Sequence, residues 1–322
     1  MLVLWQAYAT VKKAIATSHL PRTICCTIAL AMVENKKTTP EMLDFRRRID
    51  ELDDKLIDLL IERIGIIREV GEYKSKNDPG VCPLRAGREA EMILRITEKF
   101  KGTDFSESAA AAIWRLLIGA STTVENPLSI SAYAPDGQHE LYWLAREYFG
   151  PFIPASKQAH VNRVIGDVFD GKAAIGIVPQ LRRSDSSNWW AGLIQEGKNT
   201  PKIFAHIPFA YYGKQPKDAP SGLAIAKLLP EETGNDTSIL AIEASGDTSQ
   251  DKLQKAFANA KLDATWINIS TLDSPYRFHL VEVDGFHPSE SSTLKNALSS
   301  LEDAVRHIHF LGAYAKPITL DN

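Results

Sequence analysis

The sequence predicts a multidomain chain in which an all-helical N-terminal module precedes α/β segments. Residues 40–76 follow a helical pattern with no proline after Pro40, and two shorter helical patterns come next. From residue 128 onwards, short apolar runs alternate with amphipathic segments, which is typical of α/β structure. The 322 residues suffice for two or three domains. We expect four segments, namely 1–37, 38–127, 128–235 and 236–322.

The composition is that of an ordinary globular protein, with 44% hydrophobic and 24% charged residues. A net charge of -3 gives no overall attraction to nucleic acid or to an anionic membrane. No apolar run reaches the length of a membrane span. The cysteines (Cys25, Cys26 and Cys82) form neither a disulfide framework nor a metal-ligand pattern. We therefore expect a cytoplasmic protein with no metal and no cofactor.

The first 33 residues contain no Asp or Glu and include a short apolar run, ICCTIALAM. One interpretation is a disordered extension, read from an upstream start codon, with Met32 as the true beginning. The other is a secretory signal with a cleavage site at residues 29–31. We expect residues 1–37 to be a disordered extension.

The first helical pattern has an apolar seam into which two cations intrude. Thr39 and Pro40 are typical of a helix start. Arg63 and Lys74 occupy seam positions, and a buried cation without a partner is costly. Either both cations reach outward or pair with Glu62 and Glu69, or the seam opens into a pocket for an anion. The apolar members of the seam are Phe45, Ile49, Leu52, Leu56, Leu60, Ile67 and Val70.

Two further helices complete the N-terminal module. The second covers about 87–100. The third covers about 106–126, with Asp104 and Glu107 resembling a capping box. Its apolar stripe consists of Ala110, Ile113, Leu117, Ala120 and Val124.

The α/β part divides into two patterns. Residues 129–135, 173–179 and 201–213 read as strands, whereas 140–149 and part of 154–171 read as helices. After Thr237 the order becomes β-α-β-β-α-β, which is the order of a ferredoxin-like sandwich. The adjacent Trp189 and Trp190 indicate a packing pair or an exposed patch.

The N-terminal module resembles the all-helical class of chorismate mutases. The resemblance rests on LDFRRRIDELDDKLIDLLIERIGIIREVGEYK, REAEMILRI and IWRLLIGASTTVE, within residues 38–126. It implies an isomerase of phenylalanine and tyrosine biosynthesis that rearranges chorismate to prephenate. That reaction requires a compact substrate conformer and stabilisation of charge on the breaking ether oxygen.

The resemblance also implies roles for the cations. Arg63 should grip a substrate carboxylate with a bidentate fork, and Lys74 should point at the ether oxygen. Arg46 precedes Arg63 by 17 residues, about 25 Å along the helix and about 100° around it. The matching arginine of the family reaches the partner subunit's site, so an intertwined homodimer is expected.

Five further positions follow from the same resemblance. Glu89 should accept a hydrogen bond from the substrate hydroxyl, and Arg88 should add positive electrostatic potential at the site. Ser121 should lie near a carboxylate, although such a serine often bonds to the carbonyl four residues earlier. Glu125 stands where many relatives carry Gln, so it must be protonated to assist. Arg85 replaces an acidic residue and should bind a carboxylate or face water.

The remainder resembles a shrunken prephenate dehydratase. YFGPF and GDVFDGKAAIGIVPQ match the first lobe, and YRFHLVEVDGF with LKNALSSLEDAVRHIHFLGAYA matches the ACT-type domain. The Thr-Arg-Phe motif is missing, and residues 221–229 (SGLAIAKLL) stand in its place. We expect a truncated periplasmic-binding-like lobe followed by an ACT-like tail. The candidate effector of that tail is an aromatic amino acid. The alternatives are a bifunctional mutase–dehydratase and a regulatory or binding protein with an amino-acid-sensing tail.

Overall fold

The computed structural model describes residues 39–77, 82–183, 187–195, 197, 199–213, 219–272 and 275–320. The chain divides into two compact units, Met1–Arg63 and Ile64–Asn322. The prediction for residues 1–37 lies outside the described residues. In the described part, no helix combines the length and apolarity that crossing a bilayer demands.

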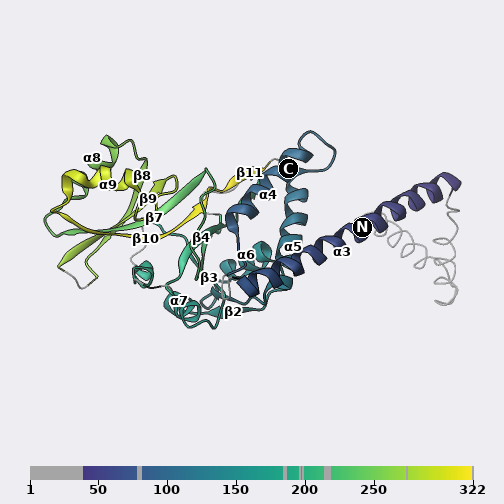
Figure 1. Ribbon diagram of the computed structural model, residues 1–322, viewed down its shortest axis with the longest axis horizontal. Coiled ribbons are helices and arrows are strands. Elements are labelled where there is room, and N and C mark those ends of the chain that lie inside the picture. Colours follow the sequence, from purple (N-terminus) through teal and green to yellow (C-terminus); the bar gives the residue numbers. More distant parts are fainter. Residues whose placement is uncertain are drawn as a thin grey trace, which may run out of the picture. The chain divides into compact units, whose positions relative to one another are not determined.

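The longest element is the helix α3 (Pro40–Asn77), which begins in the first unit and ends in the second (Figure 1). Thr39 caps it as predicted, since its Oγ1 accepts a hydrogen bond from the Met42 N–H at 3.3 Å. No residue of α3 is buried within the single chain. Four seam residues are each more than half exposed: Phe45, Ile49, Leu52 and Leu56. An exposed apolar stripe of this length marks an interaction surface.

Two shorter helices follow, α4 (Ala86–Phe100) and α5 (Glu107–Glu125), which pack against each other. The predicted capping box at Asp104 was wrong. Ser106 is the N-cap, and its side chain accepts from the Ala109 N–H at 3.1 Å. The predicted stripe of α5 was also partly wrong, because Ile113 and Val124 are exposed. The buried residues of α5 are Ala110, Ala111, Ile118, Gly119 and Ser121, and Gly119 among them lies against Phe149 of the α/β part.

The α/β segment after α5 begins with a parallel sheet flanked by helices. Strand β1 (Ile130–Tyr133) pairs with β2 (Ala155–Gln158) and with β3 (Ile175–Pro179), both in parallel. Helix α6 (Glu140–Phe149) connects β1 to β2, and α7 (Val161–Phe169) connects β2 to β3. The first part of 154–171 is thus a strand.

The next elements extend that sheet. Strand β6 (Gly222–Ala226) pairs antiparallel with both β3 and β4 (Lys202–Ile207). The sequence did not predict strand β6. The single strand expected at 201–213 is divided in two, because Pro208 interrupts it before β5 (Ala210–Tyr212). Strand β5 forms a separate two-stranded sheet with β11 (Ile318–Leu320). The short 3-10 helix η1 (Trp189–Leu193) buries Trp189 and Trp190 as a packing pair.

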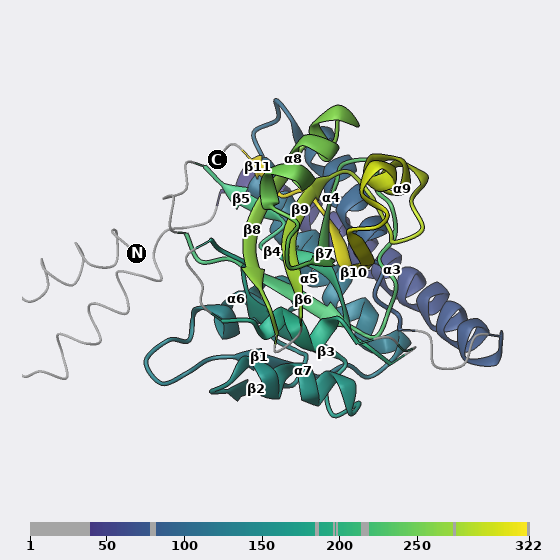
Figure 2. The same ribbon diagram turned by 90° about the vertical axis from the view of Figure 1, so that its left-hand side faces the viewer.

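The tail has the predicted order β-α-β-β-α-β. Its strands and helices are β7 (Asp236–Ser245), α8 (Gln250–Asn259), β8 (Ala264–Ser270), β9 (Tyr276–Asp284), α9 (Ser292–Leu298) and β10 (Val305–Ala315), with the short η2 (Ser299–Leu301) after α9. The strand order is β10-β7-β9-β8, and all three neighbouring pairs are antiparallel. Helices α8 and α9 lie against the sheet (Figure 2).

The two α/β patterns share one nine-stranded sheet, which the sequence did not predict. Its order is β2-β1-β3-β6-β4-β10-β7-β9-β8. The junction is the parallel pairing of Gly312 on β10 with Ile203 on β4. Gly312 has a φ of 144°, and an added Cβ would lie 2.1 Å from the Ile203 carbonyl oxygen. Only glycine therefore fits at this junction.

Candidate active site

Helix α3 meets the end of α5 at Gly71. A Cβ on Gly71 would lie 3.2 Å from the carbonyl oxygen of Glu125 and 3.3 Å from its Cα. The absence of a side chain at Gly71 therefore allows the two backbones to approach closely. One turn further along α3, Lys74 forms an ion pair with the Glu125 carboxylate. The two side chains are 26% and 14% exposed, so the pair is largely shielded from water.

The partly buried residues in the C-terminal half of α3 are Arg63, Ile64, Gly65, Ile67, Gly71 and Lys74. Burial lowers the pKa of the Arg63 guanidinium. Of the alternatives considered for Lys74, the structure gives an ion pair, with Glu125 as the partner and not Glu69. Arg46, in the N-terminal half of the same helix, is exposed.

A second ion pair joins the start of α4 to the middle of α5. The Oε2 of Glu89 accepts a hydrogen bond from the Nη1 of Arg115 at 2.9 Å, and the side chains are only 13% and 11% exposed. Burial raises the pKa of Glu89, and the charge of Arg115 offsets part of that rise. Sequence reasoning missed Arg115, because a single arginine on a helix carries no signal of its partner.

The thiol of Cys82 is close enough to both ion pairs to be affected by their charges. Burial raises the pKa of its thiol, and the charges of Glu89, Lys74 and Glu125 all act on it. The thiol of Cys82, which lies just before α4, is thus within electrostatic reach of three predicted site residues, on α3, α4 and α5.

The two arginines near the start of α4 face a different region. Arg85 donates from its Nε to Oε2 of Glu231 at 2.9 Å and from its Nη2 to Oε1 at 2.6 Å. Its carboxylate partner in the structure is thus a side chain of this chain. Arg88 is exposed and lines a cavity of about 420 Å³ together with Arg85, Gly87, Glu91, Met92, Arg95, Glu231 and Glu232.

Ser121 is buried on α5. Its hydroxyl donates a hydrogen bond to the Leu117 carbonyl oxygen at 2.5 Å, the local arrangement that sequence analysis held open. Thr122 makes the same kind of bond to Ile118 at 2.8 Å.

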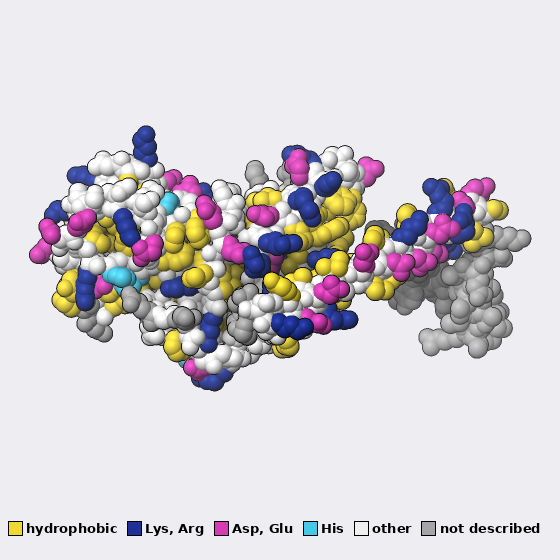
Figure 3. Space-filling view, viewed as in Figure 1, with side chains coloured by type: hydrophobic (Ala, Val, Ile, Leu, Met, Phe, Trp, Pro, Cys, Tyr) yellow, Lys and Arg dark blue, Asp and Glu magenta, His cyan; other side chains and the backbone are white. Residues whose placement is uncertain are grey.

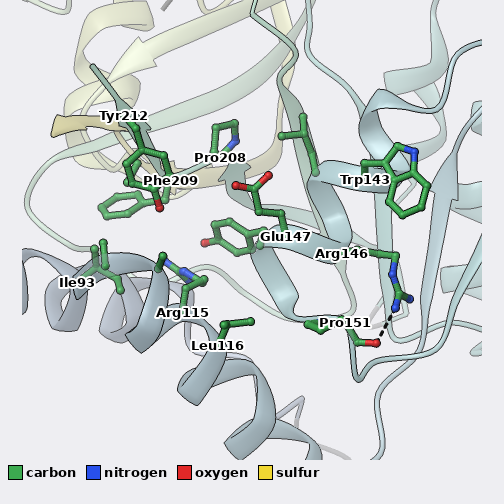
Figure 4. A pocket seen from close by; sticks show the side chains of 15 residues that line it. Ile93, Arg115, Leu116, Trp143, Arg146, Glu147, Pro151, Pro208, Phe209 and Tyr212 are labelled. Atoms are coloured by element: carbon green, nitrogen blue, oxygen red, sulfur yellow. Dashed lines mark hydrogen bonds between the residues drawn. The ribbon is translucent and has the colours of Figure 1, made fainter. Parts of the chain in front are cut away.

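A larger cavity, of about 520 Å³, lies on the far side of Arg115 (Figure 4). Its walls come mainly from α4, α5, α6, strand β5 and the two residues before β5, and they are mainly apolar. Arg115, Arg146 and Glu147 are its charged members, and the guanidinium of Arg146 donates to the Pro151 carbonyl oxygen at 2.6 Å. Within the described residues, no group of three or more His, Cys, Asp or Glu side chains could hold a metal ion.

Comparison with known proteins identifies the helical part. Residues 45–126 match the family model "Chorismate mutase type II". This segment is therefore similar to type II chorismate mutases. The match begins at Phe45 and ends at Asn126, so it includes Arg46, both ion pairs, and every other site residue predicted from the sequence.

Curated proteins similar to part of the chain include bifunctional enzymes. The "Bifunctional chorismate mutase/prephenate dehydratase" of Aquifex aeolicus is 29% identical over 140 residues, 43% of this chain and 38% of that protein. The protein of the same name from Pseudomonas aeruginosa is 29% identical over 137 residues, 42% of this chain and 37% of that protein. The matched segment thus spans less than two fifths of these relatives.

Among solved structures, a prephenate dehydratase from Streptococcus mutans is similar to part of the chain. The sequence identity is 17% and the TM-score is 0.43, over 61% of this chain and 100% of that one.

Proposed function

We propose that the protein is a chorismate mutase, which rearranges chorismate to prephenate in phenylalanine and tyrosine biosynthesis. The observation that carries this proposal is the shielded Lys74–Glu125 pair at the contact between α3 and α5. This pair lies within the segment that matches the mutase family model. In the proposed mechanism, the protein stabilises developing charge and holds the substrate in a compact conformer, and the reaction requires no metal or cofactor.

Lys74 and Glu125 act at the reacting atoms. In the rearrangement a carbon–oxygen bond breaks while a carbon–carbon bond forms, and negative charge grows on the ether oxygen. The ammonium of Lys74 donates to that oxygen, where partial burial strengthens the interaction. In the free chain Glu125 is the carboxylate partner of Lys74. It assists the reaction only as the neutral acid, so it must take up a proton when the substrate binds, because a carboxylate would repel the developing charge.

The other proposed residues bind and orient the substrate. Arg63 holds a carboxylate with its planar fork, and its partial burial favours pairing with an anion. Glu89 accepts the substrate hydroxyl. Ser121 supports a carboxylate, and the exposed Arg88 contributes positive potential from the rim. Arg85 shapes the site indirectly, through its ion pair with Glu231.

The active form is an intertwined homodimer in this proposal. Phe45, Ile49, Leu52 and Leu56 of α3 are exposed, and a second chain would cover them. Ile113 and Leu116 on α5 are also exposed, and hydrophobic side chains gather on the surface around α4 and α5 (Figure 3). Arg46, about 25 Å from Arg63 along the helix, then serves the site of the partner chain.

The remaining segments have proposed roles as well. We assign residues 38–127 to the mutase domain, 128–235 to a truncated dehydratase-like lobe and 236–322 to an ACT-type domain. The antiparallel order β10-β7-β9-β8 with two covering helices supports the last assignment. An aromatic amino acid is the proposed effector of that tail.

A second candidate is a bifunctional mutase–dehydratase. It is favoured by the names of the two curated relatives. The test is to supply prephenate and follow phenylpyruvate at neutral pH without acid treatment. Phenylpyruvate formation above the uncatalysed rate supports the second candidate. Its absence leaves the mutase as the proposed activity.

The mutase proposal is tested with the purified full chain and chorismate, by following the loss of chorismate absorbance. We expect saturable turnover that Arg63→Ala reduces by about a hundredfold or more. Absence of turnover above the uncatalysed rate would favour the remaining alternative, a regulatory protein whose helical module mainly dimerises, and turnover that Arg63→Ala leaves intact would contradict the role of Arg63.

A further inference from the structure

Arg115 connects the mutase domain to the α/β lobe through a buried cluster. Its guanidinium donates to Glu89 at 2.9 Å and lies over the ring of Tyr148, with 4.2 Å between Cζ and the ring centroid. Glu89 belongs to α4 and Arg115 to α5, whereas Tyr148 belongs to α6 of the lobe. Tyr148 is 8% exposed. Three helices thus meet at one cation.

The geometry explains why Glu89 needs this cation. A carboxylate removed from water is costly unless it is paired. Apolar side chains of the 520 Å³ cavity surround the other side of Arg115, among them Ile93, Leu116 and Phe209 (Figure 4). The side chains of the pair are only 11% and 13% exposed, and this shielding from water strengthens their attraction.

Tyr148 fixes the guanidinium in place. A guanidinium over an aromatic ring is held both by the ring quadrupole and by stacking. Because the ring comes from α6, the lobe contributes to the position of an arginine in the mutase domain. The lobe therefore has a structural reason to persist, whether or not it has its own activity.

We propose that Arg115, braced by Tyr148, is a positioning residue that holds the Glu89 carboxylate charged and oriented toward the substrate hydroxyl. This inference rests on the proposed mutase function. Arg115 acts through Glu89 and does not touch the substrate. The lobe is then an integral support of the mutase site.

The groups that face Glu89 set the direction of the expected pH effect. They are Arg115 on α5, Tyr148 on α6, the Cys82 thiol, and the backbone of Arg85; Lys74 and Glu125 act on Cys82 as well. Burial raises the pKa of Glu89, and Arg115 opposes that rise. Loss of Arg115 should therefore raise the pKa further, and Glu89 should accept a proton at a higher pH.

The test compares pH profiles of kcat/KM for the wild type, Arg115→Gln and Arg115→Lys in the full chain. The acidic limb should move to higher pH by about one unit or more in Arg115→Gln. At the acidic end its kcat/KM should fall by about tenfold or more. Arg115→Lys keeps the charge and should retain most of the wild-type limb. Arg95→Gln removes an exposed arginine of α4 and should behave as the wild type.

Other outcomes overturn the proposal in distinguishable ways. A purely structural role would lower the melting temperature and scale the whole profile without moving the acidic limb. Should Arg115→Gln fail to fold, Tyr148→Leu keeps the pair but removes its brace. The acidic limb of the pH profile of Tyr148→Leu should then also move to higher pH. An acidic limb that stays in its wild-type position contradicts the proposal. Absence of chorismate turnover in the wild type contradicts the proposed function itself, and this inference with it.

Discussion

Lys74 on α3 and Glu125, the last residue of α5, form an ion pair that is largely shielded from water. The contact depends on Gly71, one turn earlier on α3, which lets the helices approach. Chorismate rearrangement would place its ether oxygen beside these same two side chains. In the proposal, the rate of the rearrangement then depends on the positive charge of Lys74 and on whether Glu125 can donate a hydrogen bond.

Replacement of Glu125 tests its proposed role as a neutral acid. Glu125→Gln puts a neutral amide with an N–H donor in the place of the carboxyl group, so it should turn over chorismate at least as fast as the wild type. The measurement is kcat/KM, with Glu69→Gln, which replaces an exposed carboxylate on α3, as the unchanged control. A Glu125→Gln variant with kcat/KM lowered by about tenfold or more would sink the proposal.

Lys74→Ala should abolish most turnover while the fold remains. Loss of one preorganised donor at a developing oxyanion costs about a hundredfold to a thousandfold in rate. Lys76→Ala removes a neighbouring exposed charge and should change kcat/KM by less than about twofold. Steady-state kinetics with circular dichroism separates the two variants. Equal effects of both would show that the field of α3 matters and the specific contact does not.

A pair of glycine variants tests the packing of the mutase domain on the lobe. A Cβ on Gly119 of α5 would lie 2.2 Å from the carbonyl oxygen of Phe149. Gly119→Ala should therefore lower the free energy of unfolding by about 1–3 kcal/mol. Gly166 of α7 has no atom within 4 Å of such a Cβ, so Gly166→Ala should be neutral or stabilising by up to about 1 kcal/mol. Thermal unfolding of both variants is the measurement, and equal melting temperatures would contradict the packing.

Complementation tests the shared sites of the proposed dimer. Arg46→Ala and Arg63→Ala should each be nearly inactive alone. After the two are unfolded and refolded together, about half of the dimers are mixed, and each has one intact site. About a quarter of the wild-type activity should return. Activity that stays at the level of the separate variants would show that Arg46 and Arg63 do not serve sites built from two chains.

The sequence predicted the bounds of the N-terminal helices better than it predicted which faces of these helices are buried. Periodicity placed α3, α4 and α5 to within a residue or two, because each has a strong apolar pattern. It misjudged α5 because this helix is apolar on two sides, and only the fold shows that Gly119 faces α6 while Ile113 is exposed. Strand β6 was missed because a five-residue run has no periodicity of its own.

The site shows the same limit. A cation in an apolar seam can be found by spacing, so Lys74 was singled out, but its partner Glu125 is 51 residues away in the chain. The resemblance to mutases supplied Glu125 and Glu89. Neither spacing nor resemblance supplied Arg115 and Tyr148, because their pairing depends on how α6 packs against α5. Local patterns predict elements, whereas contacts between distant segments require the fold.

The most direct test of the central claim is the identity of the product formed from chorismate by the purified full chain. Proton NMR distinguishes prephenate from chorismate and from phenylpyruvate in the same tube. We predict prephenate at a rate far above the uncatalysed one, lost in Lys74→Ala and kept in Lys76→Ala. Chorismate that disappears no faster than in buffer would contradict the account.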